Sequence, residues 1–533
     1  MAPSNLVAEW QAARQALIAS DRSLRRDSQR PPLSSAEQKA EKIIRAIRKK
    51  EAEGIWAAPH EAIPHPFPGM EFLTGKKIIE QTTLFEILQK MPKGGLLHAH
   101  LDATVDVNIL LQYAIETPGM HLRIIRSLDP ATLTSNVPQF AVIPQSESTK
   151  YTSLEEAPAE SWVPIVSARD NFVNGGPAGF DEWALSTMMI NPSEAYGTHN
   201  TLTKIWQKFM TTFRATHGII YHMPIFEKYI RKSLLTSVED GISYVEPRIN
   251  FLARFMTGAD GLENIPHRDW LVVFDRILSE VKEYSKQQGN DFAGAKIIYS
   301  TVRFITPEEL EWYLQDCITL KKEFPHLIAG FDLVGDENVL HPLKYYAEVL
   351  LRFPAMQEAA GLPEDRRIPF IFHAGETLGD GSEPDDNLYD AVLLGTKRIG
   401  HGFSIVKHPK IMDICRERGI CIEVCPISNE VLRLTSSMPM HPLPIMINNG
   451  LPVALCSDDP AVFGNMGLTY DYFQVLAASE QNGLITLGEL AKDSIKFSCL
   501  ADEEKVVALK SWQRRWDAYI DMIVEKYGQE ADV

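Results

Sequence analysis

The 533-residue chain is poor in cysteine, has no excess of positive charge and contains no long apolar run. Its six cysteines all lie beyond residue 316, in neither a dense disulfide framework nor zinc-finger spacing. The net charge of -17 argues against a nucleic-acid backbone or an anionic membrane as a partner, since either favours a basic surface. No stretch approaches the roughly eighteen apolar residues of a membrane span, and the N-terminus lacks a signal-peptide core. We therefore expect a reducing, cytoplasmic location.

Residues 1–82 are charged and prone to form helices, and we interpret them as an N-terminal helical extension. Within this segment, Ser35 is a candidate N-cap, an isoleucine stripe follows at helical spacing, and Gly54 is a candidate helix stop. Such a helix packs either on the main body or on a second subunit.

From residue 93 onward, eight strand-like segments alternate with amphipathic helical stretches. The segments are GLLHAHL, ISYVEPRI, KIIYSTVRF, LIAGFDLVG, PFIFHAGE, RIGHGF, CIEVCPIS and PVALCSDD. Alternation predicts a parallel α/β sheet, and eight units predict a (β/α)8 TIM barrel over residues 83–523. A doubly wound sheet is the alternative. About 130 residues separate the first two segments, so we expect an inserted lobe at about 127–200.

Polar side chains fall at the carboxyl ends of the predicted strands, where a barrel of this type places its active site. These residues are His98, Glu246, Arg303, Asp332, His373, His401, Asn429 and Asp458. Because His98 and His100 stand at i and i+2 on an extended chain, their imidazoles point to one face. With His373 and Asp458 they offer three nitrogens and one oxygen, a donor set that suits catalytic zinc with an open position for water.

Three further residues beside these candidate ligands carry ionisable groups. Glu376 follows His373 by three residues and is placed to exchange a proton with a substrate. His401 is placed to orient and deprotonate a water molecule. Asp459 points away from its neighbour Asp458 and so can face a substrate. Each of these residues taken alone is also typical of a structural role, but several unexplained polar groups at strand ends favour a metal site.

The motifs HAHLD, FDLVGDE, FHAGET, RIGHGF, CPISN and SDDP occur in this order and together resemble the metal-dependent adenosine deaminase family. MPKGGLLHAH, KIIYS, IEVCPISNEVL and SDDPAVFG are similar to its growth-factor-related branch, the extracellular adenosine deaminases of animals. The resemblance runs from about Thr83 to Ile523. It implies a hydrolase with one zinc per subunit that converts adenosine and 2′-deoxyadenosine to inosine or its deoxy form plus ammonia.

The resemblance also assigns roles to the metal-binding and catalytic positions. It makes His98, His100, His373 and Asp458 the zinc ligands. It makes Glu376 the group that protonates purine N1, and it gives His401 the task of steering and stabilising the attacking hydroxide.

Four further positions are implied to bind the substrate. Asp459 would contact N7, and the backbone of Gly335 would contact N3. Asp102 would touch the ribose, and Trp206 would line the nucleoside pocket. The same resemblance makes a homodimer through the N-terminal helices the expected assembly.

The chain departs from the branch in its inserted lobe. No cysteine occurs in residues 1–316, whereas extracellular members carry a disulfide in this lobe and a leader peptide. The stretch VPIVSARDNF lacks the ribose-contacting glutamate of the branch, and Arg169 stands there instead. AMP or an N6-substituted adenine nucleotide is therefore an alternative substrate. A non-catalytic binding or signalling protein on the same barrel is the third hypothesis.

Overall fold

A ring of parallel strands forms the centre of the computed structural model, which describes residues 3–532 apart from 127–132, 134–135 and 148–149. Within the described residues, each of the eight predicted segments contains one strand of this ring. The strands are β1 (Gly94–His100), β5 (Ile242–Asn250), β9 (Ile297–Val302), β10 (Ile328–Val334), β11 (Ile371–Ala374), β12 (Arg398–His401), β13 (Cys421–Val424) and β14 (Val453–Leu455).

The strands pair in the order in which they follow along the chain. One sheet runs β1-β5-β9-β10, and the other runs β11-β12-β13-β14. Parallel bridges between Phe331 and Phe370 and between Ala99 and Asp458 join the two sheets at both edges. The strand order therefore returns to β1, which confirms the predicted (β/α)8 barrel and contradicts the doubly wound alternative, whose sheet has two free edges.

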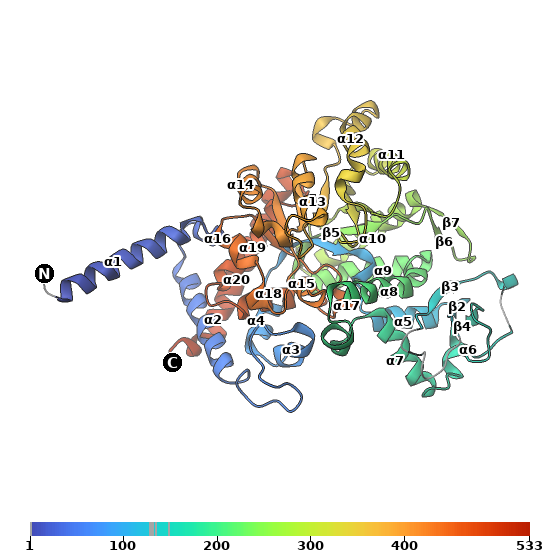
Figure 1. The fold of residues 1–533 in the computed structure, drawn as a ribbon, viewed down its shortest axis with the longest axis horizontal. Coiled ribbons are helices and arrows are strands. Elements are labelled where there is room, and N and C mark those ends of the chain that lie inside the picture. The colour runs from blue at the N-terminus through green and yellow to red at the C-terminus, as the bar shows by residue number, and fades with distance from the viewer. Residues whose placement is uncertain (1–2, 127–132, 134–135, 148–149, 533) are drawn as a thin grey trace.

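Helices connect successive strands and cover the outside of the ring (Figure 1). They are α9 (Met223–Glu239), α10 (His267–Gln287), α11 (Pro307–Glu323), α12 (Ala347–Ala359), α13 (Glu383–Leu393), α14 (Pro409–Arg418), α15 (Pro426–Val431), α16 (Leu443–Asn448), α17 (Pro460–Phe463), α18 (Thr469–Ala477), α19 (Leu484–Lys496) and α20 (Asp502–Tyr527). Helix α11 shows why they begin where they do: Thr306 and Glu309 form a capping box, and Pro307 occupies the first turn.

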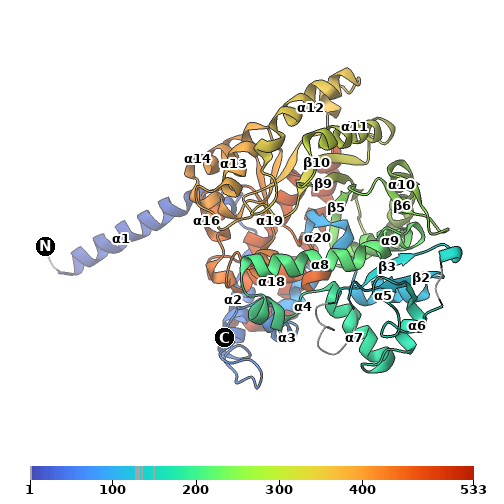
Figure 2. The same ribbon diagram turned by 45° about the vertical axis from the view of Figure 1, so that its right-hand side comes forward.

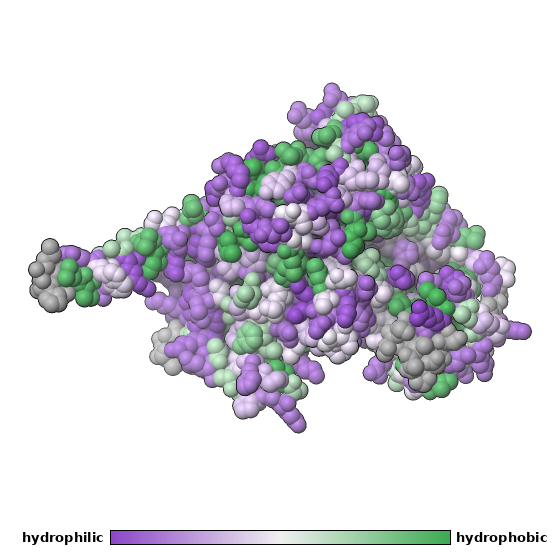
Figure 3. Space-filling model, viewed as in Figure 1, coloured by the Kyte–Doolittle hydropathy of each residue, from purple (hydrophilic) through white to green (hydrophobic). Residues whose placement is uncertain are grey.

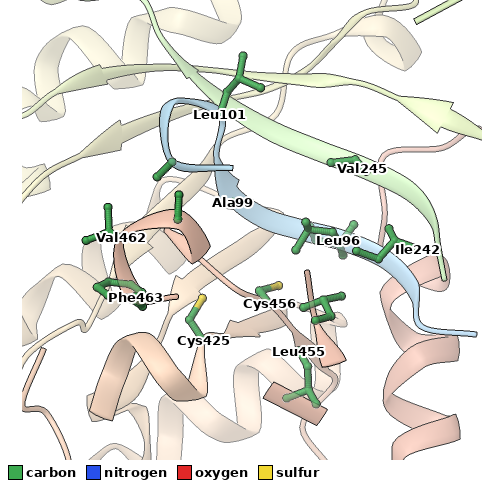
Figure 4. Packing of buried hydrophobic residues seen from close by; sticks show 14 of the residues in the cluster. Leu96, Ala99, Leu101, Ile242, Val245, Cys425, Leu455, Cys456, Val462 and Phe463 are labelled. Atoms are coloured by element: carbon green, nitrogen blue, oxygen red, sulfur yellow. The ribbon is translucent and has the colours of Figure 1, made fainter. Parts of the chain in front are cut away.

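Small apolar side chains allow the strands of the ring to pack closely. Figure 4 shows Leu96 and Ala99 of β1 between Val245 of β5 and Cys456, which follows β14. All four side chains are buried. The six cysteines are free thiols, and five of them are buried, as expected for residues that act as small hydrophobes.

The N-terminal segment contributes α1 (Pro3–Asp21), α2 (Ser35–Glu53), α3 (Phe72–Ile79) and α4 (Thr83–Gln89). The cap of α2 is Ser34, which pairs with Glu37; the prediction of Ser35 is wrong because Ser34 still has an extended backbone and Ser35 is already helical. The isoleucine stripe of α2 is buried and Gly54 follows the helix, as predicted. Helix α2 packs on α19 and α20, so its partner is the main body.

The chain between β1 and β5 forms α5 (Val107–Glu116), β2 (Met120–Arg123), β3 (Gln139–Val142), β4 (Val163–Pro164), α6 (Ile165–Asp170), α7 (Gly176–Met188) and α8 (Leu202–Ile220). Strands β3, β2 and β4 make a small antiparallel sheet that the sequence did not predict. The predicted start of the inserted lobe, 127–132, lies outside the described residues. Helix α8 runs back from this part across the barrel (Figure 2).

A second small antiparallel pair, β6 (Phe255–Thr257) and β7 (Glu263–Pro266), follows β5, and β8 (Gly294–Ala295) adds to the edge of β5. Among the helices that the structure describes, each is too short or too polar to span a lipid bilayer.

Candidate active site

Four side chains with metal-ligating atoms meet at the carboxyl end of the barrel although they are far apart in the sequence. His98 and His100 end β1, His373 lies in β11, and Asp458 follows β14. The Nε2 atoms of His98 and His100 lie 3.2 and 3.3 Å from Asp458 Oδ1. The rings of His98 and His373 are 4.5 Å apart, and those of His100 and His373 are 5.3 Å apart. The fold thus brings the four predicted zinc ligands together.

His401 lies in the same cluster. Ligating atoms of His98, His373, His401 and Asp458 all lie within 4.8 Å of one another, and those of His100, Asp458 and Asp459 form a second such group. Because Asp458 belongs to both groups, they form one site around its carboxylate. His401 Nε2 lies 3.9 Å from Asp458 Oδ2, and the Ser428 hydroxyl donates to the same oxygen over 2.7 Å.

The donor atoms of this cluster need a cation. His98 Nε2, His401 Nε2 and Asp458 Oδ1 are buried and have no hydrogen-bond partner. Nδ1 of His98 lies 2.8 Å from Glu423 Oε2 and donates a hydrogen bond to that carboxylate. Nε2 of His98 is therefore a hydrogen-bond acceptor, and it faces another acceptor, Asp458 Oδ1. Two buried acceptors in contact are costly unless a positive charge lies between or beside them. Imidazole nitrogen and carboxylate oxygen are zinc donors, so the residues fit a zinc ion.

Two buried carboxylates orient the ligand imidazoles from behind. Asp332 Oδ2 lies 2.7 Å from His373 Nδ1, and its Oδ1 accepts the His373 backbone N–H over 3.0 Å. Glu423 Oε2 likewise lies 2.8 Å from His98 Nδ1. Burial lowers the pKa of His373 to about 3, so its imidazole is neutral as a metal ligand requires. From the sequence, Asp332 was noted without a role and Glu423 was not noted. The position of Glu423, a charged residue inside an apolar strand, could have indicated its importance.

Two strand ends of the site have a backbone that residues with a Cβ seldom adopt. His401 and Asp458 both have a φ of 60°. Such a left-handed conformation costs of order 1–3 kcal/mol and persists only where the surroundings impose it. Here the cost accompanies a sharp turn that places both side chains in the cavity wall.

A cavity opens above this cluster, and nine of the ten predicted site residues line it. They are His100, Asp102, Trp206, Gly335, His373, Glu376, His401, Asp458 and Asp459. His98 is fully buried beneath them. Helix α8 forms one wall, with Trp206, Met210, Phe213 and His217 at helical spacing. Of these only Trp206 was predicted, because an apolar helical stripe by itself indicates only a core contact.

Besides the donor atoms of the cluster, three further polar atoms in or beside the cavity wall are buried and have no hydrogen-bond partner. They are Glu376 Oε1, Asp459 Oδ1 and Trp206 Nε1. Burial, together with the charges of Asp458 and Glu337, raises the pKa of Glu376 well above its ordinary value, which favours the protonated form of this carboxyl. Burial and the Asp458 charge raise the pKa of Asp459 in the same direction.

The backbone around Glu376 is held by a buried acid. The N–H groups of Gly375 and Glu376 donate to the Glu337 carboxylate over 3.2 and 3.0 Å. Gly335, which also lines the cavity, has a φ of 112°, and a Cβ there would lie 2.7 Å from the Leu340 side chain. A glycine is therefore required at 335, and it leaves the backbone open to the cavity.

Arg169 lies elsewhere. Its guanidinium forms two 2.8 Å hydrogen bonds with Asp181, and it does not line the cavity. Among the described residues of the cavity wall there is no lysine or arginine. Glu246 and Arg303, noted from the sequence as strand-end residues, are buried in the barrel interior and also do not line the cavity.

The fold and this site together define a TIM-barrel hydrolase with a buried His/Asp metal centre. Residues 188–511 match the family model described as adenosine deaminase. Adenosine deaminase 2-A of Danio rerio is 33% identical over 460 residues, covering 85% of this chain and 84% of that protein. Adenosine deaminase 2 of Sus scrofa is 33% identical over 494 residues, covering 92% and 89%. The chain therefore belongs to the adenosine deaminase family, whose members depend on zinc.

A solved structure shares the fold. An amidohydrolase from Burkholderia ambifaria with bound zinc superposes with a TM-score of 0.52 at 17% identity, covering 86% of this chain and 98% of that one. The comparisons also correct one expectation. The predicted cytoplasmic location is wrong, because the relatives named adenosine deaminase 2 represent a secreted, extracellular family.

Proposed function

We propose that this protein hydrolyses the 6-amino group of adenosine and of 2′-deoxyadenosine, releasing ammonia and leaving inosine or its deoxy form. The observation that carries this proposal is the set of buried, unpartnered atoms around one cavity. His98 Nε2, His401 Nε2 and Asp458 Oδ1 suit a cation, whereas Glu376, Asp459 and Trp206 offer polar atoms to a heterocycle. The names of the relatives support the same reaction and the same substrate.

His98, His100, His373 and Asp458 would hold one zinc ion per subunit. When bound, zinc lowers the pKa of water from 15.7 to about 7 and so makes a nucleophile available at neutral pH. Burial lowers the pKa of His401 well below its usual value, so its neutral imidazole is able to accept a proton from the attacking water and to hold it in place.

The proton on Glu376 would be donated to purine N1, which makes C6 more electrophilic. N3 and N7 of adenine are also hydrogen-bond acceptors, so they need donors. The Gly335 backbone would serve N3, and the protonated Asp459 carboxyl would serve N7. Asp102 would bind ribose hydroxyls, and Trp206 would cover the nucleoside.

A comparison of adenosine, 2′-deoxyadenosine, AMP and N6-methyl-AMP tests the substrate. We expect the kcat/KM of adenosine to exceed that of AMP by at least about tenfold, which corresponds to roughly 1.4 kcal/mol. The reason is that a 5′-phosphate would enter a cavity walled by Asp102, Asp458 and Asp459 without a lysine or arginine among its described lining residues. Preference for either nucleotide would contradict this substrate, and no turnover of any of the four with zinc bound would contradict catalysis.

We also propose that two copies associate through α1. This helix projects from the body in both views (Figures 1 and 2), and apolar side chains lie along it (Figure 3). Leu6, Trp10 and Leu17 are exposed and share one face of the helix. Because most helical stability in proteins comes from packing of one helix face, this 19-residue helix would gain stability from a partner.

Sedimentation equilibrium tests this assembly. We expect a dimer for the unaltered chain and a monomer for the Trp10→Glu, Leu17→Glu variant, which places charges on the shared face. Glu9→Gln, adjacent to this face, is the control and should remain dimeric. An unaltered chain that sediments as a monomer, or a double variant that stays dimeric, would rule this interface out.

A further inference from the structure

One of the buried arginines behind the metal cluster, Arg248, takes no part in the roles proposed above. Arg248 belongs to β5, and its side chain is fully buried. Its Nε donates to Asp332 Oδ2 and its Nη2 donates to Glu423 Oε2, each over 2.8 Å. Its Nη1 donates to the Leu97 carbonyl over 3.1 Å, one residue before the ligand His98. Every arm of the guanidinium is therefore engaged.

The two oxygens that Arg248 contacts are the same oxygens that hold the ligand imidazoles. Glu423 Oε2 is 2.8 Å from His98 Nδ1, and Asp332 Oδ2 is 2.7 Å from His373 Nδ1. Each carboxylate thus fixes one imidazole with its proton on Nδ1 and its lone pair on Nε2, the form that binds a metal. The planar guanidinium fixes the separation of the two carboxylates, because its N–H groups diverge at set angles.

We infer that Arg248 is a positioning residue that couples His98 to His373, so that both imidazoles are presented to the metal as one preformed unit. The inference rests on the ligand set proposed above. A lysine would conserve the charge but, as a flexible point donor, would not hold both carboxylates at a fixed spacing. Removing the arginine altogether would leave two buried anions uncompensated, which makes lysine the more informative replacement.

Zinc affinity, measured by competition with a chelating dye in the absence of substrate, tests the inference. Arg248→Lys should weaken zinc binding by about 10- to 100-fold, the range that loss of such outer contacts produces. Arg398→Lys is the matched control. Arg398 is equally buried and also bonds Glu423, through the other oxygen, but its second carboxylate is Glu246, which holds no ligand imidazole. The Arg398→Lys variant should lose less than about threefold in zinc affinity, since Arg398 does not connect the two imidazoles. A loss in Arg248→Lys no larger than in Arg398→Lys would overturn the inference.

A double-mutant cycle in the unaltered background supplies a second readout, one that does not require the Arg248 variant to fold. Glu423→Gln and Asp332→Asn should each weaken zinc binding, because an amide N–H directed at Nδ1 favours the wrong tautomer. When the two substitutions are combined, the loss of zinc affinity should be smaller than the product of the single losses by at least about fivefold. The reason is that the first change already releases the shared guanidinium. In the Arg248→Lys background, the losses should multiply.

Strictly multiplicative losses in the unaltered background would overturn the coupling even if Arg248→Lys fails to fold. Failure of the proposed function gives a different result. If the unaltered chain binds no zinc, or if His98→Ala binds zinc normally, then the ligand set itself is wrong, whatever Arg248 does.

Discussion

Replacement of Glu376 by glutamine should reduce deamination of adenosine by at least about 10³-fold while zinc stays bound. The variant conserves shape but removes the ionisable carboxyl, whose protonated form is favoured because burial and the Asp458 and Glu337 charges raise its pKa. Because the proposed donation to N1 occurs as C6 is attacked, the loss should appear in kcat, with KM changed little. Steady-state kinetics and zinc content, measured on the same preparation, check this expectation.

The matched control is Glu430→Gln, the same substitution at another fully buried acid with a raised pKa. Glu430 Oε2 accepts hydrogen bonds from the Phe72 N–H and the Tyr196 hydroxyl over 3.0 and 2.9 Å, and Glu430 does not line the cavity. The activity of the Glu430→Gln variant should remain within about twofold of that of the unaltered chain, as is usual for a conservative change outside an active site. A Glu376→Gln variant that keeps a tenth or more of the original kcat would remove Glu376 from the proposed role.

Removal of zinc should abolish turnover and also lower the thermal unfolding midpoint. A ligand that binds only the native state stabilises it by RT ln(1 + [L]/Kd), about 4.1 kcal/mol at roughly 1,000 times Kd. Loss of the ion would also leave the buried acceptor atoms His98 Nε2 and Asp458 Oδ1 without a cation to share. Dialysis against a chelator, followed by an activity assay and thermal unfolding, measures both effects.

Addition of zinc should restore both activity and the unfolding midpoint, whereas magnesium should restore neither. Magnesium prefers an octahedral set of oxygen ligands, and three of the four proposed ligands are imidazoles. The replacement Asp458→Ala should mimic the chelated protein, because this carboxylate belongs to both ligand groups. Full activity in protein freed of zinc would refute the metal-dependent mechanism.

The central barrel was predictable because its signals are local. Each strand-like segment ends in a polar residue, and parallel strands of a barrel present their carboxyl ends to one mouth. Strand direction alone therefore predicts that His98, His373 and Asp458 lie near one another. The alternation of side chains along a strand likewise predicts that His98 and His100 share a face.

Features that depend on detailed contacts were not predictable in the same way. The sequence offers two adjacent serines at the start of α2, and only the backbone shows that Ser34 is the cap. Arg169 suggested phosphate binding, but its guanidinium is paired with Asp181. The cellular location was mispredicted. That prediction rested on the N-terminal residues and on the small number of cysteines, and neither feature is part of what determines the fold.

By itself, the sequence determined the barrel, the identity of the candidate ligands and the end of the barrel at which they meet, because periodicity and strand direction are properties of short segments. Only the tertiary structure decided how the imidazoles are oriented. Glu423, Asp332 and Arg248 come from three separate strands, and hydrogen bonding depends on atomic separations that strand order does not encode. The left-handed turns at His401 and Asp458 were likewise set by the surrounding barrel, since the local sequence disfavours them.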